Sequence, residues 1–174
     1  PLDMDTVSSL KIGEKVAISG ILYSARDAAH KRLVELIENG KELPFKLEGQ
    51  VIYYVGPTPA KPGYAVGSAG PTTSSRMDPY APILIARGLK GMIGKGPRAK
   101  EVIEAMKKYG AAYVAAVGGA GALISKSIVS AEVIAYPELG AEAIRRMEVK
   151  DFPAIVAIDA AGNDLFEVGR RSTP

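Results

Sequence analysis

The sequence of 174 residues contains no cysteine, no tryptophan and a single histidine. The absence of cysteine excludes disulfides, thiolate nucleophiles and any zinc or iron–sulfur site built from thiolates of this chain. One histidine cannot form a metal site by itself. The sequence therefore predicts no metal held by this chain alone.

Long apolar runs and concentrated positive charge are also missing. No stretch approaches about 18 uninterrupted apolar residues, and the first ten residues, PLDMDTVSSL, lack a charged segment followed by an apolar one. Lys and Arg number 22 against 19 Asp and Glu, and these residues are scattered, so no phosphate-neutralising stripe forms. We therefore expect a cytoplasmic protein that binds neither a membrane nor nucleic acid.

The remaining composition is that of an ordinary globular domain, with 47% hydrophobic and 24% charged residues. Segments rich in apolar and β-branched residues alternate with segments of helical periodicity. Strands are predicted at 15–24, 51–55, 111–117 and 128–136, and helices at 27–40 and 98–109. This alternation predicts one α/β domain over residues 1–174, with a mixed sheet.

From Pro137 onwards the chain no longer shows the alternation described above. Pro137 and Gly140 precede a segment that is expected to form a short helix through Met147. The closing stretch PAIVAIDAAGNDLFEVG is expected to form two strands around a glycine-asparagine turn. A hairpin would then close the domain.

The segment GPTTSSRMDPY, from Gly70 to Tyr80, is typical of a loop that holds an anion. Backbone N–H groups at a helix start attract negative charge, hydroxyls add neutral donors, and the guanidinium of Arg76 can bind a carboxylate with two parallel hydrogen bonds. The alternative is a helix cap rich in Ser and Thr beside a surface arginine.

Three other segments carry candidate residues. GMIGKGP places Lys95 between two glycines; this is not a Walker A loop, because glycine follows the lysine, and an exposed lysine in a turn is the alternative. SARDAAHKR places Arg26 at a strand-to-helix turn, with Asp27 as the expected helix cap. The glycine-rich 118–125 segment could cradle an anion, or its small residues could allow close packing.

His30, one turn into the same predicted helix, has a side chain suited to a catalytic or phosphocarrier role. A lone histidine on a helix is more often structural. The whole set of two arginines, a lysine and hydroxyls suits a di-anion, but it lacks an electrophile that would activate water. If the chain belongs to an enzyme, another component must supply one.

Taken with SARDAAHKR, GKG and the closing DFPAIVAIDAAGNDLFE, the segment GPTTSSRMDPY resembles the β subunit of class I fumarases and the related L-tartrate dehydratases. The resemblance covers nearly the whole chain, in several separated motifs that include GPTT-x-x-RMD. Ser74 and Ser75 stand where many relatives carry Ala-Gly, which alters the loop and leaves the substrate open.

The resemblance implies a swivelling β/β/α domain and a two-part enzyme that hydrates fumarate reversibly to L-malate. A partner α subunit would hold a [4Fe–4S] cluster through three cysteines, in an α2β2-type assembly. By position, Thr72 matches the proposed catalytic base, and Arg26, Arg76 and Lys95 match groups that hold the carboxylates of the substrate.

Three alternatives remain open at this point. The chain could belong to an L-tartrate dehydratase, with the same chemistry on a substrate that carries a second hydroxyl. It could be a phosphocarrier swivelling domain, with His30 as the acceptor. It could also be a dicarboxylate-binding module without catalysis.

Overall fold

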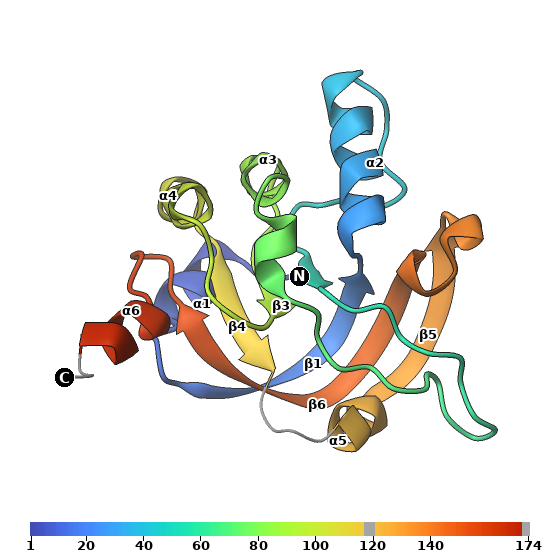
Figure 1. The fold of residues 1–174 in the computed structure, drawn as a ribbon. Helices are drawn as coiled ribbons and strands as arrows, with labels where there is room; N and C mark the ends of the chain where they lie inside the picture. The colour runs from blue at the N-terminus through green and yellow to red at the C-terminus, as the bar shows by residue number, and fades with distance from the viewer. Residues whose placement is uncertain (117–120, 172–174) are drawn as a thin grey trace.

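The computed structural model of the chain describes residues 1–116 and 121–171. Its strands form one mixed sheet in the order β1-β2-β3-β4-β6-β5, and β1 also pairs with β6, so the sheet closes on itself into a barrel (Figure 1). The strands are β1 Lys15–Ser24, β2 Val51–Tyr53, β3 Gly91–Gly94, β4 Ala112–Ala116, β5 Ile128–Ala135 and β6 Ile144–Ile158. The expected α/β class with a mixed sheet is confirmed.

The helices connect these strands or flank the barrel. The α-helices are α1 Met4–Ser9, α2 Asp27–Glu38, α3 Ala81–Ala86, α4 Lys100–Tyr109, α5 Gly121–Ser127 and α6 Leu165–Arg171. Two 3₁₀ helices, η1 Ser74–Met77 and η2 Pro137–Glu142, complete the regular structure of the described residues.

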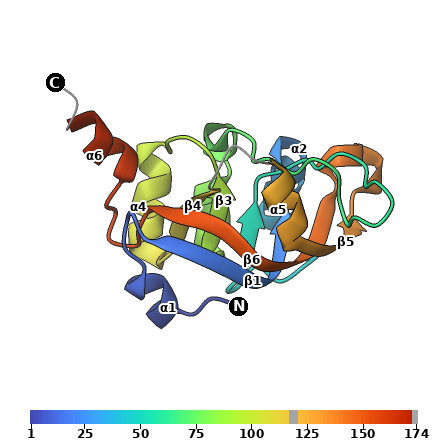
Figure 2. The same cartoon turned by 90° about the horizontal axis from the view of Figure 1, so that it is seen from below.

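Strands β1 to β4 run parallel, and β6 runs antiparallel to β1, β4 and β5. Parallel neighbours require crossover connections, and α2, α3 and α4 lie in these connections, on one face of the sheet (Figure 1). Seen from below, β6 and β1 cross in front of β3 and β4 (Figure 2). Because β1 to β4 are parallel, their carboxyl ends lie at the same edge of the sheet.

Alternation along the short central strands divides the core into two clusters. Ile52, Met92 and Tyr113 point toward the helices and are fully buried there. Their neighbours Tyr53 and Ile93 point into the barrel, where they pack against β6. Both faces of β2 and β3 are thus buried, which explains their unbroken apolar sequence.

Both helices predicted from periodicity are confirmed, each with one end shifted by two residues. In α2, Ala29 and Leu33 are fully buried one turn apart, and Gly40 with φ 64° follows the helix end. In α4, Val102 and Met106 are buried in the same spacing, and Gly110 with φ 77° ends the helix. Strand β3 was not predicted, since four residues with a glycine at each end carry little pattern.

The predicted helix through Met147 is wrong, because this segment belongs to the long strand β6. Met147 pairs with Leu22 of β1 on one side and with Ala131 of β5 on the other. Closing the barrel requires a strand between these two neighbours. Tertiary pairing therefore overrides the local preference for helix here.

The predicted C-terminal hairpin is also wrong, because a helix, α6, follows the turn. The Asp159 carboxylate accepts hydrogen bonds from the backbone N–H groups of Ala161 and Asn163, which closes the turn. Asp164 Oδ1 then accepts from Phe166 N at 2.9 Å, in the manner of a helix N-cap. Hydrogen bonds from the backbone to Asp159 and Asp164 thus support a turn and a helix at the position where a second strand was predicted.

Candidate functional site

Segments from three strand ends meet at the carboxyl edge of the parallel strands. Ala25 N donates to Tyr53 O at 3.1 Å, which joins the end of β1 to that of β2. Thr72 N donates to Tyr54 O at 2.8 Å, and Ser74 N donates to Lys95 O at 2.9 Å. The segment 72–74 is thus held between the residues that follow β2 and β3, the edge at which α/β sheets commonly bind ligands.

Arg26 and Arg76 are brought together by one carboxylate. Arg76 Nε donates to Asp27 Oδ2 at 2.8 Å, and Arg26 Nε lies 3.9 Å from Asp27 Oδ1. The arginines come from different crossovers, Arg26 from the β1–α2 turn and Arg76 from η1. The expectation that Asp27 caps α2 is wrong, since the N-cap is Arg26, with no side-chain hydrogen bond at the cap.

The arginine pair adjoins the Thr72 segment through residues 54–56. Tyr54 supplies the carbonyl that holds Thr72, and two residues later a Cβ on Gly56 would lie 3.0 Å from Arg26 Cδ. Gly56 therefore leaves room for the arginine side chain. Thr72 is half-buried, and Lys95, bridged through its backbone to Thr73, is exposed. The segments that carry the four predicted residues thus lie together at one edge of the sheet.

A buried arginine lies behind this edge and was not identified from the sequence. The side chain of Arg98 has no exposed surface and donates to Asp78 Oδ1 at 2.8 Å and to Tyr54 Oη at 3.0 Å. Its guanidinium carbon lies 4.8 Å from the ring centroid of Tyr113 and 5.1 Å from that of Tyr54. Asp78 also accepts from Ala99 N at 2.8 Å, at the start of α4. Loop 72–78 and α4 are thereby tied to one charge pair.

Tyr113 links the two loops that carry Thr72 and Lys95. Its hydroxyl donates to Gly96 O at 2.8 Å and shares a hydrogen bond of 2.7 Å with Ser74 Oγ. Burial raises the pKa of Tyr113 to about 12, so the phenol keeps its proton at neutral pH. Ser74, expected to help bind an anion, is fully buried in this contact and serves the loop itself.

His30 is structural in this fold. Its side chain is fully buried, and Nδ1 lies 2.8 Å from the carbonyl oxygen of Arg26, which can only accept, so Nδ1 carries the proton. Burial lowers the pKa of His30 to about 4, and its ring stands edge-on to Tyr54 at 5.4 Å. A phosphoryl donor has no access to this imidazole, so the geometry does not support the phosphocarrier alternative.

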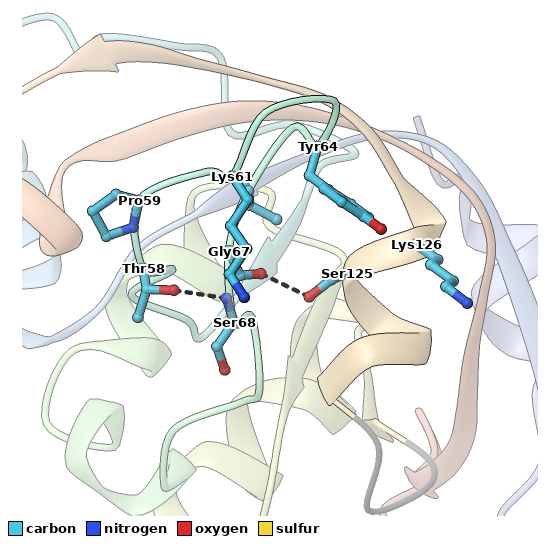
Figure 3. Close-up of a pocket in the computed structure, with 9 residues that line it drawn as sticks. Thr58, Pro59, Lys61, Tyr64, Gly67, Ser68, Ser125 and Lys126 are labelled. Atoms are coloured by element: carbon cyan, nitrogen blue, oxygen red, sulfur yellow. Dashed lines mark hydrogen bonds between the residues drawn. The ribbon is translucent and has the colours of Figure 1, made fainter.

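A hollow of about 420 Å³ lies away from these residues, between the 58–68 loop and α5 (Figure 3). Ser125 Oγ donates to Gly67 O at 2.7 Å and Thr58 Oγ1 accepts from Ser68 N at 2.7 Å, so hydrogen bonds tie the loop to α5 and close its base. None of the residues that line it is one of the four candidates. The anion cradle expected at 118–125 begins within residues 117–120, which lie outside the described residues.

No three His, Asp or Glu side chains lie close enough to hold a metal ion anywhere in residues 1–116 and 121–171. In the same part of the chain no helix combines the length and the apolar character needed to cross a bilayer.

A family model described as the fumarase C-terminus matches residues 2–169. The chain is 42% identical over 163 residues to the anaerobic class I fumarate hydratase of Escherichia coli (strain K12). The aligned residues make up 92% of this chain and 30% of that protein. Fumarate hydratase 2 of Leishmania major is 41% identical over 162 residues, covering 92% of this chain and 28% of that protein. The chain thus spans about three-tenths of the length of these curated relatives.

Another relative is similar in length to this chain. The putative L(+)-tartrate dehydratase subunit beta of Methanocaldococcus jannaschii is 37% identical over 167 residues, which cover 92% of this chain and 86% of that protein.

Proposed function

The chain belongs to the fumarase C-terminus family, and we propose that it is the carboxylate-binding part of an iron–sulfur hydro-lyase that hydrates fumarate reversibly to L-malate. The observation that carries the proposal is the joining of Arg26 and Arg76 by Asp27, beside the segment that holds Thr72. A pair of guanidinium groups at a strand edge suits a small di-acid.

In this proposal Arg26, Arg76 and Lys95 bind the two carboxylates of the substrate. Each guanidinium can donate two parallel hydrogen bonds to a carboxylate, which fixes its plane as well as its position. Lys95 adds a compact charge from the loop after β3. Orientation matters for a hydration because the attacking oxygen and the transferred proton approach defined carbon atoms.

Thr72 is the proposed proton-transfer group at the carbon next to the one that carries the hydroxyl. A neutral threonine hydroxyl is a weak base, so it must first lose its proton to a stronger base, for which we propose a carboxylate of the partner. The positive charges of Arg76 and Lys95 would stabilise the resulting alkoxide. The 2.8 Å bond from Thr72 N to Tyr54 O holds the backbone while the side chain acts.

The donor set of this chain does not fit an iron–sulfur cluster. There is no cysteine in the sequence, and the single histidine is buried, with Nδ1 bonded to a backbone carbonyl. We therefore assign a [4Fe–4S] cluster to a partner α subunit, in an α2β2-type assembly. The resemblance to a protein named as a subunit beta supports a separate partner chain.

The same relative favours a second candidate, L-tartrate dehydration, because it matches this chain over most of its own length. Both substrates are four-carbon di-acids, and the arginine pair suits either. The extra hydroxyl of tartrate would have to be accommodated beside the Thr72 segment.

Co-expression with an α-like subunit tests the proposal, followed by anaerobic assay with fumarate, L-malate and L-tartrate. We expect the complex to interconvert fumarate and malate, and each subunit alone to be inactive. Turnover of tartrate alone would select the second candidate. A folded, iron-loaded complex that acts on none of the three acids would refute both.

Arginine variants test the carboxylate contacts. Arg76→Lys keeps the charge but cannot reproduce a bidentate contact, so we expect a fall in kcat/KM with folding intact. Arg76→Ala should cost roughly 2–5 kcal/mol in transition-state binding. Arg32→Lys, on the exposed side of α2, is the matched control. Wild-type kinetics for Arg76→Ala would remove this residue from the site.

The Thr72 hydroxyl is tested by Thr72→Val, with Thr73→Val as the neighbouring control. Valine keeps the β-branched shape and so preserves the backbone preference of the loop. We expect kcat of Thr72→Val to fall by about 10²–10⁴-fold while substrate binding changes less. Exchange of the malate C3 proton with solvent at the wild-type rate would place the base elsewhere.

A further inference from the structure

We propose that Asp27 is the positioning residue for the di-acid, because its carboxylate bonds Arg76 and lies next to Arg26. This inference rests on the proposed role of the two arginines in binding the substrate. It adds a residue whose effect is exerted through them and not by contact with the substrate.

The contact with Arg76 determines which part of its guanidinium is left available. Arg76 donates to Asp27 Oδ2 through Nε at 2.8 Å, and this is the ion pair that Arg76 makes within residues 1–116 and 121–171. A bond at Nε fixes the plane of the group and leaves the edge formed by the two terminal nitrogens for another carboxylate. The side chain of Arg76 is 52% exposed, so without this bond it would rotate freely.

The contact with Arg26 is close but incomplete. Arg26 Nε and Asp27 Oδ1 are 3.9 Å apart, and both atoms are buried without a hydrogen-bond partner. A buried donor and a buried acceptor left without hydrogen bonds are unfavourable, so a small movement of Arg26 that closes the gap is favoured. Binding of a carboxylate to the Arg26 guanidinium provides such a movement. Asp27 would then hold both arginines at once.

The backbone around Asp27 is well anchored, which is needed if its carboxylate is to orient other groups. Ala25 N is bonded to Tyr53 O at 3.1 Å, and Arg26 O accepts from both the backbone N and the Nδ1 of His30, at 2.9 and 2.8 Å. Asp27 is the first residue of α2, where the helix N-terminus favours a negative side chain. The carboxylate is therefore presented from a fixed turn.

The charge of the site gives the test a direction. Arg26, Arg76 and Lys95 carry three positive charges and Asp27 one negative charge, a sum of +2 over these four groups. Removal of Asp27 would raise this charge to +3 and, by Coulomb attraction alone, strengthen the binding of a di-anion. Weaker binding after removal of Asp27 would therefore be opposite in sign to the charge effect, as lost positioning requires.

The test compares Asp27→Ala with Glu138→Ala in the assembled enzyme. Glu138 of η2 pairs with Arg32, which lies on α2 like Asp27, so the control removes an arginine–carboxylate pair that contains none of the four candidate residues. We expect Asp27→Ala to lower kcat/KM about tenfold, mainly through KM, and to raise the inhibition constant of succinate by a similar factor. Glu138→Ala should leave both unchanged.

A double-mutant cycle distinguishes positioning from a general structural role. In an Arg76→Ala background, Asp27→Ala should weaken succinate binding much less than in the wild-type enzyme, by about threefold or less, because the arginine that it bonds is gone and only Arg26 is left to position. Asp27→Asn serves if the alanine variant does not fold; its amide keeps one acceptor oxygen but puts an NH2 donor, which an arginine cannot bond, in place of the other, so KM should rise by about threefold or more.

Additive effects of the two substitutions, or tighter succinate binding by Asp27→Ala, would overturn the positioning role. An assembled wild-type enzyme that neither turns over the di-acids nor binds succinate would overturn the proposed function and this inference with it. Active wild-type enzyme with an unaffected Asp27→Ala variant would overturn this inference alone.

Discussion

Acidification should destabilise the fold through its single histidine. His30 is fully buried, and burial is the main reason that its pKa is lowered from 6.5 to about 4. Between these two values the unfolded chain binds a proton that the folded chain does not, so the free energy of unfolding falls as pH falls. The full difference corresponds to about 3 kcal/mol, at 1.36 kcal/mol for each pKa unit.

The window near pH 5 isolates this effect from the carboxylates. Asp3 and Glu138, whose pKa values are lowered chiefly by hydrogen bonds to Thr6 and Arg32, stay mostly ionised in both states there and lose most of their contributions at lower pH. Relative to pH 7 we expect a loss of about 2 kcal/mol at pH 5 from His30, measured by urea unfolding. In His30→Gln, whose side-chain amide can still donate to Arg26 O, this part of the pH dependence should disappear.

NMR measures the pKa of His30 directly, because one histidine produces one set of imidazole resonances. The folded protein should show no titration of these resonances between pH 7 and 5. A pKa near 6.5 in the folded state, or an unchanged pH dependence in His30→Gln, would refute the assignment of a buried, neutral imidazole on α2.

Further predictions concern the loops and the cofactor. Tyr113→Phe should cost about 1–3 kcal/mol of stability by urea unfolding and also lower activity, because Ser74 and Gly96 O lose their shared partner. Gly94→Ala should cost about 1–3 kcal/mol, since its Cβ would lie 2.0 Å from Ser74 Oγ and 2.8 Å from Tyr54 Cδ2; a wild-type unfolding midpoint would contradict this. The purified chain should show no iron–sulfur absorbance after anaerobic reconstitution, because it contains no cysteine.

The elements predicted correctly are those whose pattern is local and repeated. The strand at 15–24 and the helices α2 and α4 carry enough consecutive periodic residues for their buried faces to be identified from the sequence. Strand β6 was misassigned near Met147, and α6 was expected to be a strand. In both cases the outcome depends on partners far away in sequence or on side-chain contacts within a turn.

The candidate residues could be named from the sequence, but their relationship could not. Arg26, Thr72, Arg76 and Lys95 stand in glycine- and proline-bounded motifs, which mark loops in any α/β fold. That Asp27 pairs with both arginines instead of capping α2 follows from where two crossovers bring their side chains. No pattern in SARDAAHKR distinguishes these two roles.

By itself the sequence determined the class of fold and the absence of thiolate ligands, and it supplied the cationic loops, because composition and short-range periodicity carry this information. Only the tertiary structure decided that the strand ends of β1, β2 and β3 place those loops at one edge, with Arg98 buried behind them. The reason is physical: a hydrogen bond or ion pair between residues far apart in the chain exists only once the barrel has closed and brought them within about 3 Å.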